Sequence, residues 1–485
     1  MAGRVKLTIV EGPMSGREFD FAEHDTFLFG RKSDCHVHIS GDGFVSRHHF
    51  ILEANPPQAR LRDLGSMNGT FVNGDKCGGR LQGESPDQGA ERAYPQFDLS
   101  DGDTIRVGET VFRVAIERTG PAVRVQCQQC GRDVSREADA GEDGEYICAQ
   151  CRQDAAEDPL RLLRQRNAPN EAEERMLIQG ELEDYEIERP LGRGGMGAVY
   201  LARRMDDDAR VALKVMLAKV VVDERARQAF LREMDTLRDL EHPNIVRFIE
   251  GGATGGAFFF VMEYCNKGSL STLIDKRGGR VPLRIAAPIM LQVLKGLAYA
   301  HEKGLVHRDL NPNNILIHEE DGVWRPKVSD FGLAKNFERA GFSGLTATQG
   351  YSGTFSYVPR EQVTSFRYVK PVSDVWSAGA TFYTMLTGAF PRLAGPDADP
   401  LNVVLEADAT PITQCGVPLA PDVAAVIDKA LATNPRKRYA DAGEFRQALK
   451  KALREACSSE AGSELYAEDV GAANAQQAGI GEETR

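Results

Sequence analysis

The first 117 residues alternate apolar and polar side chains over short stretches that Gly, Asn, Asp and Pro separate. Such period-two alternation is typical of strands with one buried face, and many short strands without a helical period predict a β-sandwich. Seven stretches are predicted as strands: residues 5–10, 26–29, 50–53, 60–63, 70–72, 104–107 and 111–116. We place this domain at residues 1–118, with an extended Gly-, Glu- and Asp-rich loop from about Lys76 to Gln96.

The pattern changes further along the chain. Residues 211–214 and 258–265 predict strands, the first of which ends at Lys214. Residues 225–240 repeat apolar side chains at helical spacing and predict a helix. Residues 157–183 and 457–485 have too few apolar side chains for a core, so we predict a linker and a disordered acidic tail.

Length and composition indicate a soluble protein of several domains. The 485 residues are too many for one ordinary core, and 42% of them are apolar while 27% are charged. The net charge of −12 disfavours non-specific binding to nucleic acid or anionic membranes. We find no run of 18 apolar residues, no signal peptide and no secreted disulfide pattern among the nine cysteines, which predicts a cytoplasmic location.

Four of the cysteines form two C-x-x-C pairs within residues 121–156. Cys127 and Cys130 are separated by 17 residues from Cys148 and Cys151, a spacing typical of a zinc ribbon. About thirty residues cannot bury enough surface to fold unaided, whereas four thiolates on Zn²⁺ supply roughly 10–16 kcal/mol. Because sulfur fills all four ligand positions, the zinc is predicted to be structural. A redox dithiol is the alternative chemistry, and the acidic loop between the pairs disfavours nucleic-acid binding.

Three loops of the predicted sandwich carry a combined motif: Gly30-Arg31, Ser46-Arg47-His48-His49 and Ser66-Met67-Asn68-Gly69-Thr70. They resemble the signature of the forkhead-associated (FHA) domain. The resemblance implies an all-β domain that binds phosphothreonine in a flexible protein segment.

The FHA resemblance also implies which residues bind phosphothreonine: Arg31, Ser46, Arg47 and Asn68. The Arg31 guanidinium and the Ser46 hydroxyl offer donors to a phosphate, and Asn68 offers both ends of its amide to a peptide main chain. His49 is expected to brace the loops. Met67 departs from the family, in which Thr or Ser is common at this place, so a hydroxyl near the phosphothreonine is lost.

Three further motifs lie in the second half of the chain. Residues 192–199 read G-R-G-G-M-G-A-V, residues 305–314 read L-V-H-R-D-L-N-P-N-N and residues 330–332 read D-F-G. They resemble the glycine-rich loop, the catalytic loop and the metal-binding motif of protein kinases of the bacterial (Hanks) type. The resemblance covers residues 184–456 and implies an α+β fold with a small β-rich lobe, a larger helical lobe and ATP between them.

The kinase resemblance implies a role for each matching side chain. Asp309 is expected to accept the proton of a protein Ser or Thr hydroxyl, while Asn314 and Asp330 bind Mg²⁺ or Mn²⁺. Lys214 is expected to hold the ATP phosphates and to pair with Glu233. The residues expected around ATP are Leu191, Gly192, Gly194, Gly197, Val199, Ala212, Lys214, Met262, Glu263 and Cys265.

One position of the catalytic loop departs from serine/threonine kinases, where Lys is usual two residues after the catalytic Asp. Asn311 can donate a hydrogen bond to the transferring phosphoryl group but cannot neutralise its charge, so we predict that Asn311 limits the chemical step. Pro312 and Thr354 still favour Ser/Thr substrates. The kinase is predicted to be active, and an FHA scaffold with an inactive kinase domain is the alternative.

Other residues are expected to support or regulate the catalytic loop. His307 is predicted to be a packed structural residue, Asp374 to anchor the loop backbone, and Glu361 to pair with Arg438.

Thr346 and Thr348 lie in a polar, Gly-flanked stretch and are the predicted autophosphorylation sites. We expect the phosphothreonine reader to bind this segment, within one chain or between two, or else to bind a separate protein. Tethering within one chain raises the effective concentration to about millimolar, so even a weak site would be occupied.

Overall fold

The computed structural model describes residues 3–22, 25–56, 58–81, 94–117, 126–127, 130–132, 144–145, 151, 184–194, 197–217, 222–223, 237–254, 257–331, 354–364, 369–392 and 400–458. The chain divides into two compact units. One unit contains Arg118–Asn266 and Leu333–Thr348, and the other contains Ala2–Glu117, Lys267–Gly332 and Gln349–Arg485.

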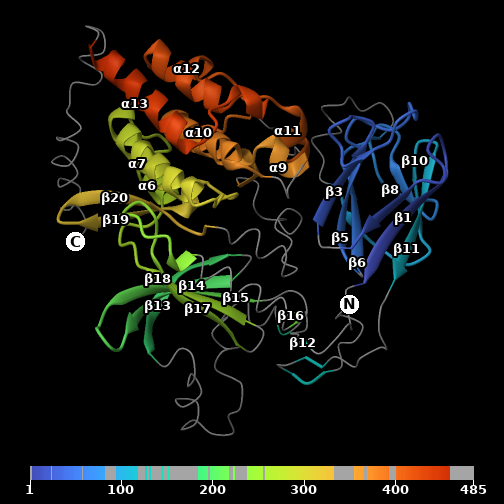
Figure 1. Cartoon of the computed structure of the whole chain (residues 1–485), viewed down its shortest axis with the longest axis horizontal. Coiled ribbons are helices and arrows are strands. Elements are labelled where there is room, and N and C mark those ends of the chain that lie inside the picture. The colour runs from blue at the N-terminus through green and yellow to red at the C-terminus, as the bar shows by residue number, and fades with distance from the viewer. Residues whose placement is uncertain are drawn as a thin grey trace. The chain divides into compact units, whose positions relative to one another are not determined.

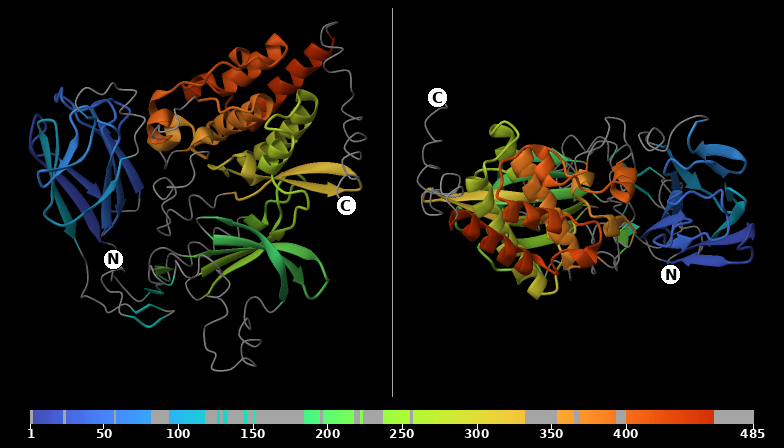
Figure 2. Two further views of the ribbon diagram at one scale, coloured as in Figure 1. Left: turned by 180° about the vertical axis from the view of Figure 1, so that it is seen from behind. Right: turned by 90° about the horizontal axis from the view of Figure 1, so that it is seen from above.

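The N-terminal domain is a sandwich of two sheets (Figure 1). The six-stranded sheet has the order β2-β1-β11-β10-β7-β8, with β1 (Arg4–Glu11), β2 (Glu18–Phe21), β7 (Thr70–Val72), β8 (Asp75–Gly78), β10 (Thr104–Val107) and β11 (Thr110–Glu117). The five-stranded sheet has the order β4-β3-β5-β6-β9, with β3 (Asp25–Gly30), β4 (Val37–His38), β5 (Phe50–Asn55), β6 (Gln58–Asp63) and β9 (Gln96–Leu99). Both ribbon views in Figure 2 show the two sheets facing each other.

Aromatic side chains from both sheets form the centre of the sandwich core. Phe29 and Phe50 stack with ring centroids 4.3 Å apart, and both meet the edge of Phe112 from the opposite sheet. All three rings are fully buried, as the alternation of apolar positions requires. The predicted β-sandwich is therefore confirmed, and its seven predicted strands lie within one or two residues of the observed ones.

The predicted loop from Lys76 to Gln96 is wrong at its beginning, because β8 continues to Gly78 and pairs with β7. The sequence signal is weak there, since Cys77 is the one buried apolar side chain of β8. Position 78 requires glycine because the strand passes close to Asp63: a Cβ atom there would lie 2.1 Å from the Cβ of Asp63.

The other unit contains a five-stranded antiparallel sheet of order β13-β14-β15-β18-β17. Its strands are β13 (Tyr185–Gly194), β14 (Gly197–Arg204), β15 (Arg210–Leu217), β17 (Phe248–Thr254) and β18 (Ala257–Glu263). Strand β15 does not end at Lys214 as predicted, because Leu213 and Val215 are both buried and continue the alternation past it. The same unit pairs β12 (Gly144–Glu145) with β16 (Val222–Asp223).

The remaining described residues are mainly helical and contain a β-hairpin (Figure 1). The helices are α6 (Leu270–Lys276), α7 (Leu283–Glu302), α9 (Arg360–Thr364), α10 (Pro371–Thr387), α11 (Pro400–Glu406), α12 (Pro421–Ala430) and α13 (Ala442–Ser458). Four 3₁₀ turns are η1 (Pro312–Asn314), η2 (Thr354–Tyr357), η4 (Ile412–Cys415) and η5 (Pro435–Lys437), and the hairpin consists of β19 (Ile315–Glu320) and β20 (Val323–Val328). Helix α10 is the core element, since every residue from Ser373 to Thr387 is buried.

Among the described residues, one helix, α7, is long and apolar enough to cross a membrane by its length and composition. Half of that apolar window is buried inside the unit, as expected for the core helix of a folded domain.

Several predicted elements lie outside the described residues. These are the linker at 157–183, the helix at 225–240 before residue 237, and the tail after residue 458.

Candidate functional site

The catalytic loop is fastened to the helical core by the carboxylate of Asp374, which α10 carries and which is 1% exposed. Its Oδ2 accepts hydrogen bonds from the backbone N–H of His307 and from His301 Nε2, each at 2.8 Å. Its Oδ1 accepts from the backbone N–H of Arg308 at 2.9 Å. The predicted anchoring role of Asp374 is thereby confirmed.

Burial alone would raise the pKa of Asp374, because it disfavours the charged form. The hydrogen bond from His301 and the nearby imidazoles of His301 and His307 outweigh that effect and hold the pKa below its ordinary value. Asp374 is therefore an anion at neutral pH, which suits an acceptor of three hydrogen bonds.

His307 supports the loop from inside, as predicted. Its side chain is completely buried and packs on Phe331 with ring centroids 4.7 Å apart. Its Nε2 forms a hydrogen bond of 2.7 Å with the carbonyl of Ser329. Its Nδ1 accepts from the backbone N–H of Asp309 at 3.2 Å, which leaves Nε2 as the donor to Ser329.

Two residues of the kinase motifs have a left-handed backbone conformation, which residues other than glycine rarely adopt. Arg308 has φ +71° and Asp330 has φ +61°. Each such residue costs on the order of 1–3 kcal/mol, and the surrounding structure must hold it in place. Two hydrogen bonds hold Arg308 in this conformation. Its backbone N–H donates to Asp374, and Gln362 Nε2 donates to its carbonyl at 2.6 Å.

The carboxylate of Asp309 lies between two amide side chains. Asn314 Nδ2 donates to Asp309 Oδ2 at 3.0 Å and Asn311 Nδ2 donates to Oδ1 at 3.2 Å. Both amides also donate to the Asp309 carbonyl. The Oδ1 of Asn311 accepts from the backbone N–H of Asn313 at 2.9 Å and so caps η1. Asn311 therefore orients the proposed base, a role that the sequence did not predict.

The pKa of Asp309 is raised above its ordinary value, chiefly by burial and further by the charge of Asp330. The hydrogen bonds from Asn314 and Asn311 act in the opposite direction, because they favour the charged form. A carboxylate with a raised pKa is a stronger base, which suits the acceptance of a proton from a hydroxyl.

The predicted ion pair behind the loop is confirmed. Arg438 binds Glu361 through two parallel bonds, Nη1–Oε1 at 2.6 Å and Nη2–Oε2 at 3.0 Å. Ser373 Oγ also donates to Glu361 at 2.9 Å. The guanidinium of Arg438 is fully buried, so this pair fixes α9 to the helical core.

The residues predicted to surround ATP lie on neighbouring strands of the five-stranded sheet. Val199 on β14 pairs with Lys214 on β15, and Ala212 on β15 pairs with Met262 on β18. Leu191, Gly192 and Gly194 belong to β13, Gly197 to β14 and Glu263 to β18, while Cys265 follows β18. A Cβ on Gly192 would meet no atom within 4 Å, so the described structure leaves open space beside this glycine. Glu233, the predicted partner of Lys214, lies outside the described residues.

The three FHA loops are joined by hydrogen bonds. The backbone N–H of Arg31 donates to the Ser46 carbonyl at 3.0 Å, and Ser46 Oγ accepts from the backbone N–H of Met67 at 2.9 Å. Since Ser46 Oγ is an acceptor here, its own proton remains to be donated to a phosphate. The buried His49 accepts from the Ser46 N–H at Nδ1 and bonds to the Gly69 carbonyl through Nε2, which confirms that it braces the loops.

Two FHA side chains make contacts within the chain that the sequence did not predict. Asn68 Nδ2 donates to the Phe44 carbonyl at 2.7 Å, so part of its amide is already used within the domain. The guanidinium of Arg47 bonds to Glu406 at 3.1 Å, a residue that the sequence did not single out.

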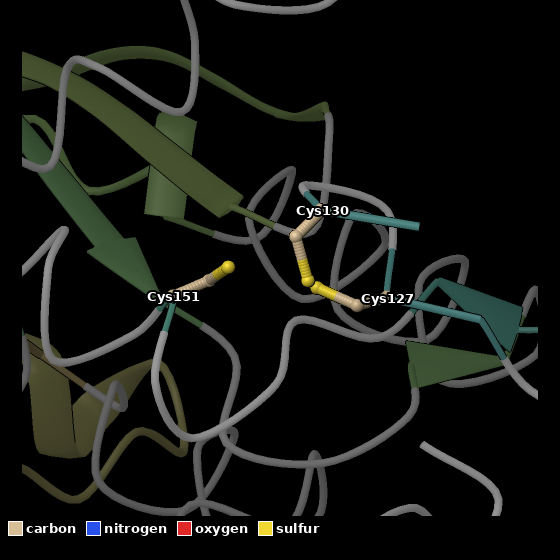
Figure 3. A group of neighbouring side chains, drawn as sticks. All are labelled: Cys127, Cys130 and Cys151. Carbon is tan, nitrogen blue, oxygen red and sulfur yellow. The ribbon is translucent and has the colours of Figure 1, made fainter. Parts of the chain in front are cut away.

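Three of the four predicted zinc ligands lie together. The sulfurs of Cys127, Cys130 and Cys151 are within 4.8 Å of one another, and Figure 3 shows the three side chains converging. The first pair sits on a tight turn in which the Gly131 N–H donates to the Cys127 carbonyl at 2.8 Å. Cys148 lies outside the described residues.

The loop that Asp374 anchors holds Asp309 between two amides. This loop and the glycine-rich motif of β13 and β14 are both typical of a protein kinase domain. The family model described as "Protein kinase domain" matches residues 185–453, and the model described as "FHA domain" matches residues 27–108. The chain belongs to the protein kinase family and carries an FHA domain at its N-terminal side.

Known serine/threonine kinases resemble the kinase part of the chain. "Serine/threonine-protein kinase PknJ" of Mycobacterium tuberculosis is 36% identical over 272 residues, which cover 56% of this chain and 45% of that protein. "Serine/threonine-protein kinase PknB" of Mycolicibacterium smegmatis is 34% identical over 269 residues, covering 55% and 42%. The chain thus spans less than half the length of these two relatives.

We predict that Asn311→Ala lowers the rate of phosphoryl transfer roughly 10- to 100-fold, because a hydrogen bond to a charged group is worth about 1.5–3 kcal/mol. It should also move the acid limb of the pH–rate profile upward, since Asn311 lowers the pKa of Asp309. Autophosphorylation rates between about pH 5 and pH 9 measure both effects.

The matched control is Asn313→Ala, which removes an exposed amide from the next position but one. The Asn311→Lys variant separates the two roles of Asn311: a faster rate supports the phosphoryl contact expected from the sequence, and a slower rate supports the orientation of Asp309. An unchanged pH profile in Asn311→Ala contradicts the orienting role.

Proposed function

We propose that the chain is an active protein serine/threonine kinase that transfers the γ-phosphate of ATP to Ser or Thr hydroxyls. The observation that carries the proposal is the geometry of Asp309, whose carboxylate is partly buried, raised in pKa and fixed by hydrogen bonds from Asn311 and Asn314. Such a group accepts the hydroxyl proton as the oxygen forms its bond to phosphorus and ADP leaves.

The metal-binding residues proposed are Asn314 and Asp330. Both offer oxygen ligands, which Mg²⁺ and Mn²⁺ prefer, and the bonds that Asn314 Nδ2 makes to Asp309 leave the amide oxygen to a cation. A bound divalent cation would neutralise charge that develops on the phosphates. Lys214 would hold the phosphates from β15, and Glu233 would pair with Lys214 as the sequence predicts.

The activity test is incubation of the full chain with γ-³²P-labelled ATP and Mg²⁺, with and without a mixture of Ser/Thr peptides. We expect transfer to Ser and Thr, and at least a thousandfold loss in Asp309→Asn, whose side chain keeps its shape but cannot accept a proton. The absence of transfer by the unaltered chain would favour the scaffold alternative, in which the kinase domain is inactive.

We also propose that the FHA domain reads phosphothreonine through Arg31, Ser46, Arg47 and Asn68. The support is the bonded set of loops around Ser46 and the match of this segment to the FHA family. Its partners would be phosphothreonine segments of other proteins or of this chain. Thr346 and Thr348, the proposed autophosphorylation sites, lie outside the described residues.

For residues 121–156 we propose a structural zinc held by Cys127, Cys130, Cys148 and Cys151. The clustering of three of these sulfurs supports the proposal. Cysteine thiolates fit zinc by their chemistry, and the metal would stabilise a segment too short to fold alone. We also propose a cytoplasmic protein. The net charge of −12 supports the further proposal that it binds neither nucleic acid nor anionic membranes.

Elemental analysis should find one zinc per chain in protein purified with zinc present. The Cys127→Ser/Cys148→Ser double variant should contain none, since it loses one ligand from each pair. Cys415→Ser, which alters a cysteine far from both pairs in sequence, is the control and should retain the metal. Full zinc occupancy in the double variant contradicts this assignment.

A further inference from the structure

One face of the FHA loops is in contact with helix α11, and both belong to the same compact unit. Glu406, the last residue of α11, receives a bond from His48 Nδ1 at 2.8 Å on one carboxylate oxygen and from Arg47 Nη2 at 3.1 Å on the other. One helical turn earlier, Asn402 Nδ2 donates to the Leu64 carbonyl at 2.7 Å. The contact therefore has two polar anchors, four residues apart on one helix face.

The groups at this contact are complementary in charge. Arg47 and Lys32 place positive charge around Glu406 and, although burial would raise the pKa of Glu406, the bond from His48 and the nearby cations lower it. His48, which is 5% exposed, bonds through its other nitrogen to Asp34 at 3.0 Å. Glu406 is thus an anion that contacts the loop of residues 46–49, which we call the cationic loop for Arg47 and His48, while Asp34 is a second anion that bonds to His48 and Lys32.

This cationic loop is also part of the proposed phosphothreonine site. Arg47 is next to Ser46 in the sequence, and its carbonyl accepts from the backbone N–H of Lys32 at 3.1 Å, beside the link between Arg31 and Ser46. A guanidinium that is bonded to a carboxylate offers fewer donors to a phosphate. A phosphorylated segment and Glu406 therefore require the same Arg47 side chain.

The ion pair between Arg47 and Glu406 is exposed to water, which is expected of a contact that can open. The anchoring residues His48 and Asn402 are each 5% exposed, whereas the side chains of Arg47 and Glu406 are 61% and 36% exposed. An ion pair that water reaches contributes roughly 0–1 kcal/mol, so a phosphate with two negative charges can displace the carboxylate.

We propose that the Asn402–Glu406 face of α11 is an internal ligand of the FHA domain, and that it competes with phosphothreonine segments for Arg47. The proposal rests on the proposed phosphothreonine binding of the FHA domain. Occupation of the FHA site by a phosphorylated segment would release α11, which makes the kinase domain's own helix the sensor of that occupation.

The first test measures the contact by itself, without any phosphopeptide. Hydrogen–deuterium exchange of the full-length chain should become faster in residues 46–49 and 62–66 when Asn402 and Glu406 are both replaced by Ala. The Glu455→Ala control changes a surface carboxylate of α13 and should leave these segments unchanged. Equal exchange in the Asn402→Ala/Glu406→Ala variant and the unaltered chain overturns the proposal.

The second test measures competition, with a degenerate pool of phosphothreonine peptides as the probe. If the docked form is about 90% populated, Glu406→Gln should tighten binding of the pool by roughly tenfold, because the apparent affinity scales with the competent fraction. Glu455→Gln should bind like the unaltered chain, and an equal affinity of Glu406→Gln overturns the competition.

Arg31→Ala separates the two levels of the argument. If neither the unaltered chain nor Glu406→Gln binds the pool in an Arg31-dependent way, the phosphothreonine function fails, and the competition fails with it. The exchange experiment still decides then whether α11 docks on the FHA loops.

Discussion

The carboxylate of Asp374 is the constraint on which the catalytic loop depends. It is one buried anion with two oxygens, and it accepts the N–H groups of His307 and Arg308 together with the imidazole of His301. These bonds hold Arg308 in its left-handed conformation, and the next residue, Asp309, is placed between two amides as a consequence. A buried charge of this kind contributes only while all its partners remain, because each unsatisfied donor would cost about 1–3 kcal/mol.

A comparable device organises the FHA loops, although its central groups differ. His49 joins the Ser46 loop to Gly69, and the buried Asp63 accepts from Ser66 and Thr70. In both domains a buried polar group thus fixes a loop, so that exposed residues can meet a ligand. The two loops have related proposed roles: the catalytic loop would transfer a phosphate to a hydroxyl, and the FHA loops would bind the phosphorylated product.

Much of this architecture could be predicted from the sequence, for identifiable reasons. Short strands with one buried face produce a period of two, and the catalytic motifs are local runs such as residues 305–314. The failures have different causes. Strand β8 pairs with the neighbouring strand β7 but has little apolar signal of its own. Asn311 bonds to Asp309 only two residues away, yet the direction of its side chain depends on the folded loop and not on the residue types. The bond between His48 and Glu406 joins residues 358 positions apart, a separation that no periodicity reports.

The most direct test of the central claim is the autophosphorylation rate of Asp374→Asn. An Asn side chain has one acceptor oxygen, and its NH₂ group replaces the second oxygen of Asp374. The backbone N–H of His307 or that of Arg308 would therefore point at a donor and lose its hydrogen bond. We expect the rate to fall about 100-fold, equivalent to about 2.7 kcal/mol. The fluorescence of Trp324 and Trp376, which lie in β20 and α10, should show that the helical part remains folded. A folded Asp374→Asn protein that transfers phosphate at the unaltered rate would contradict the account.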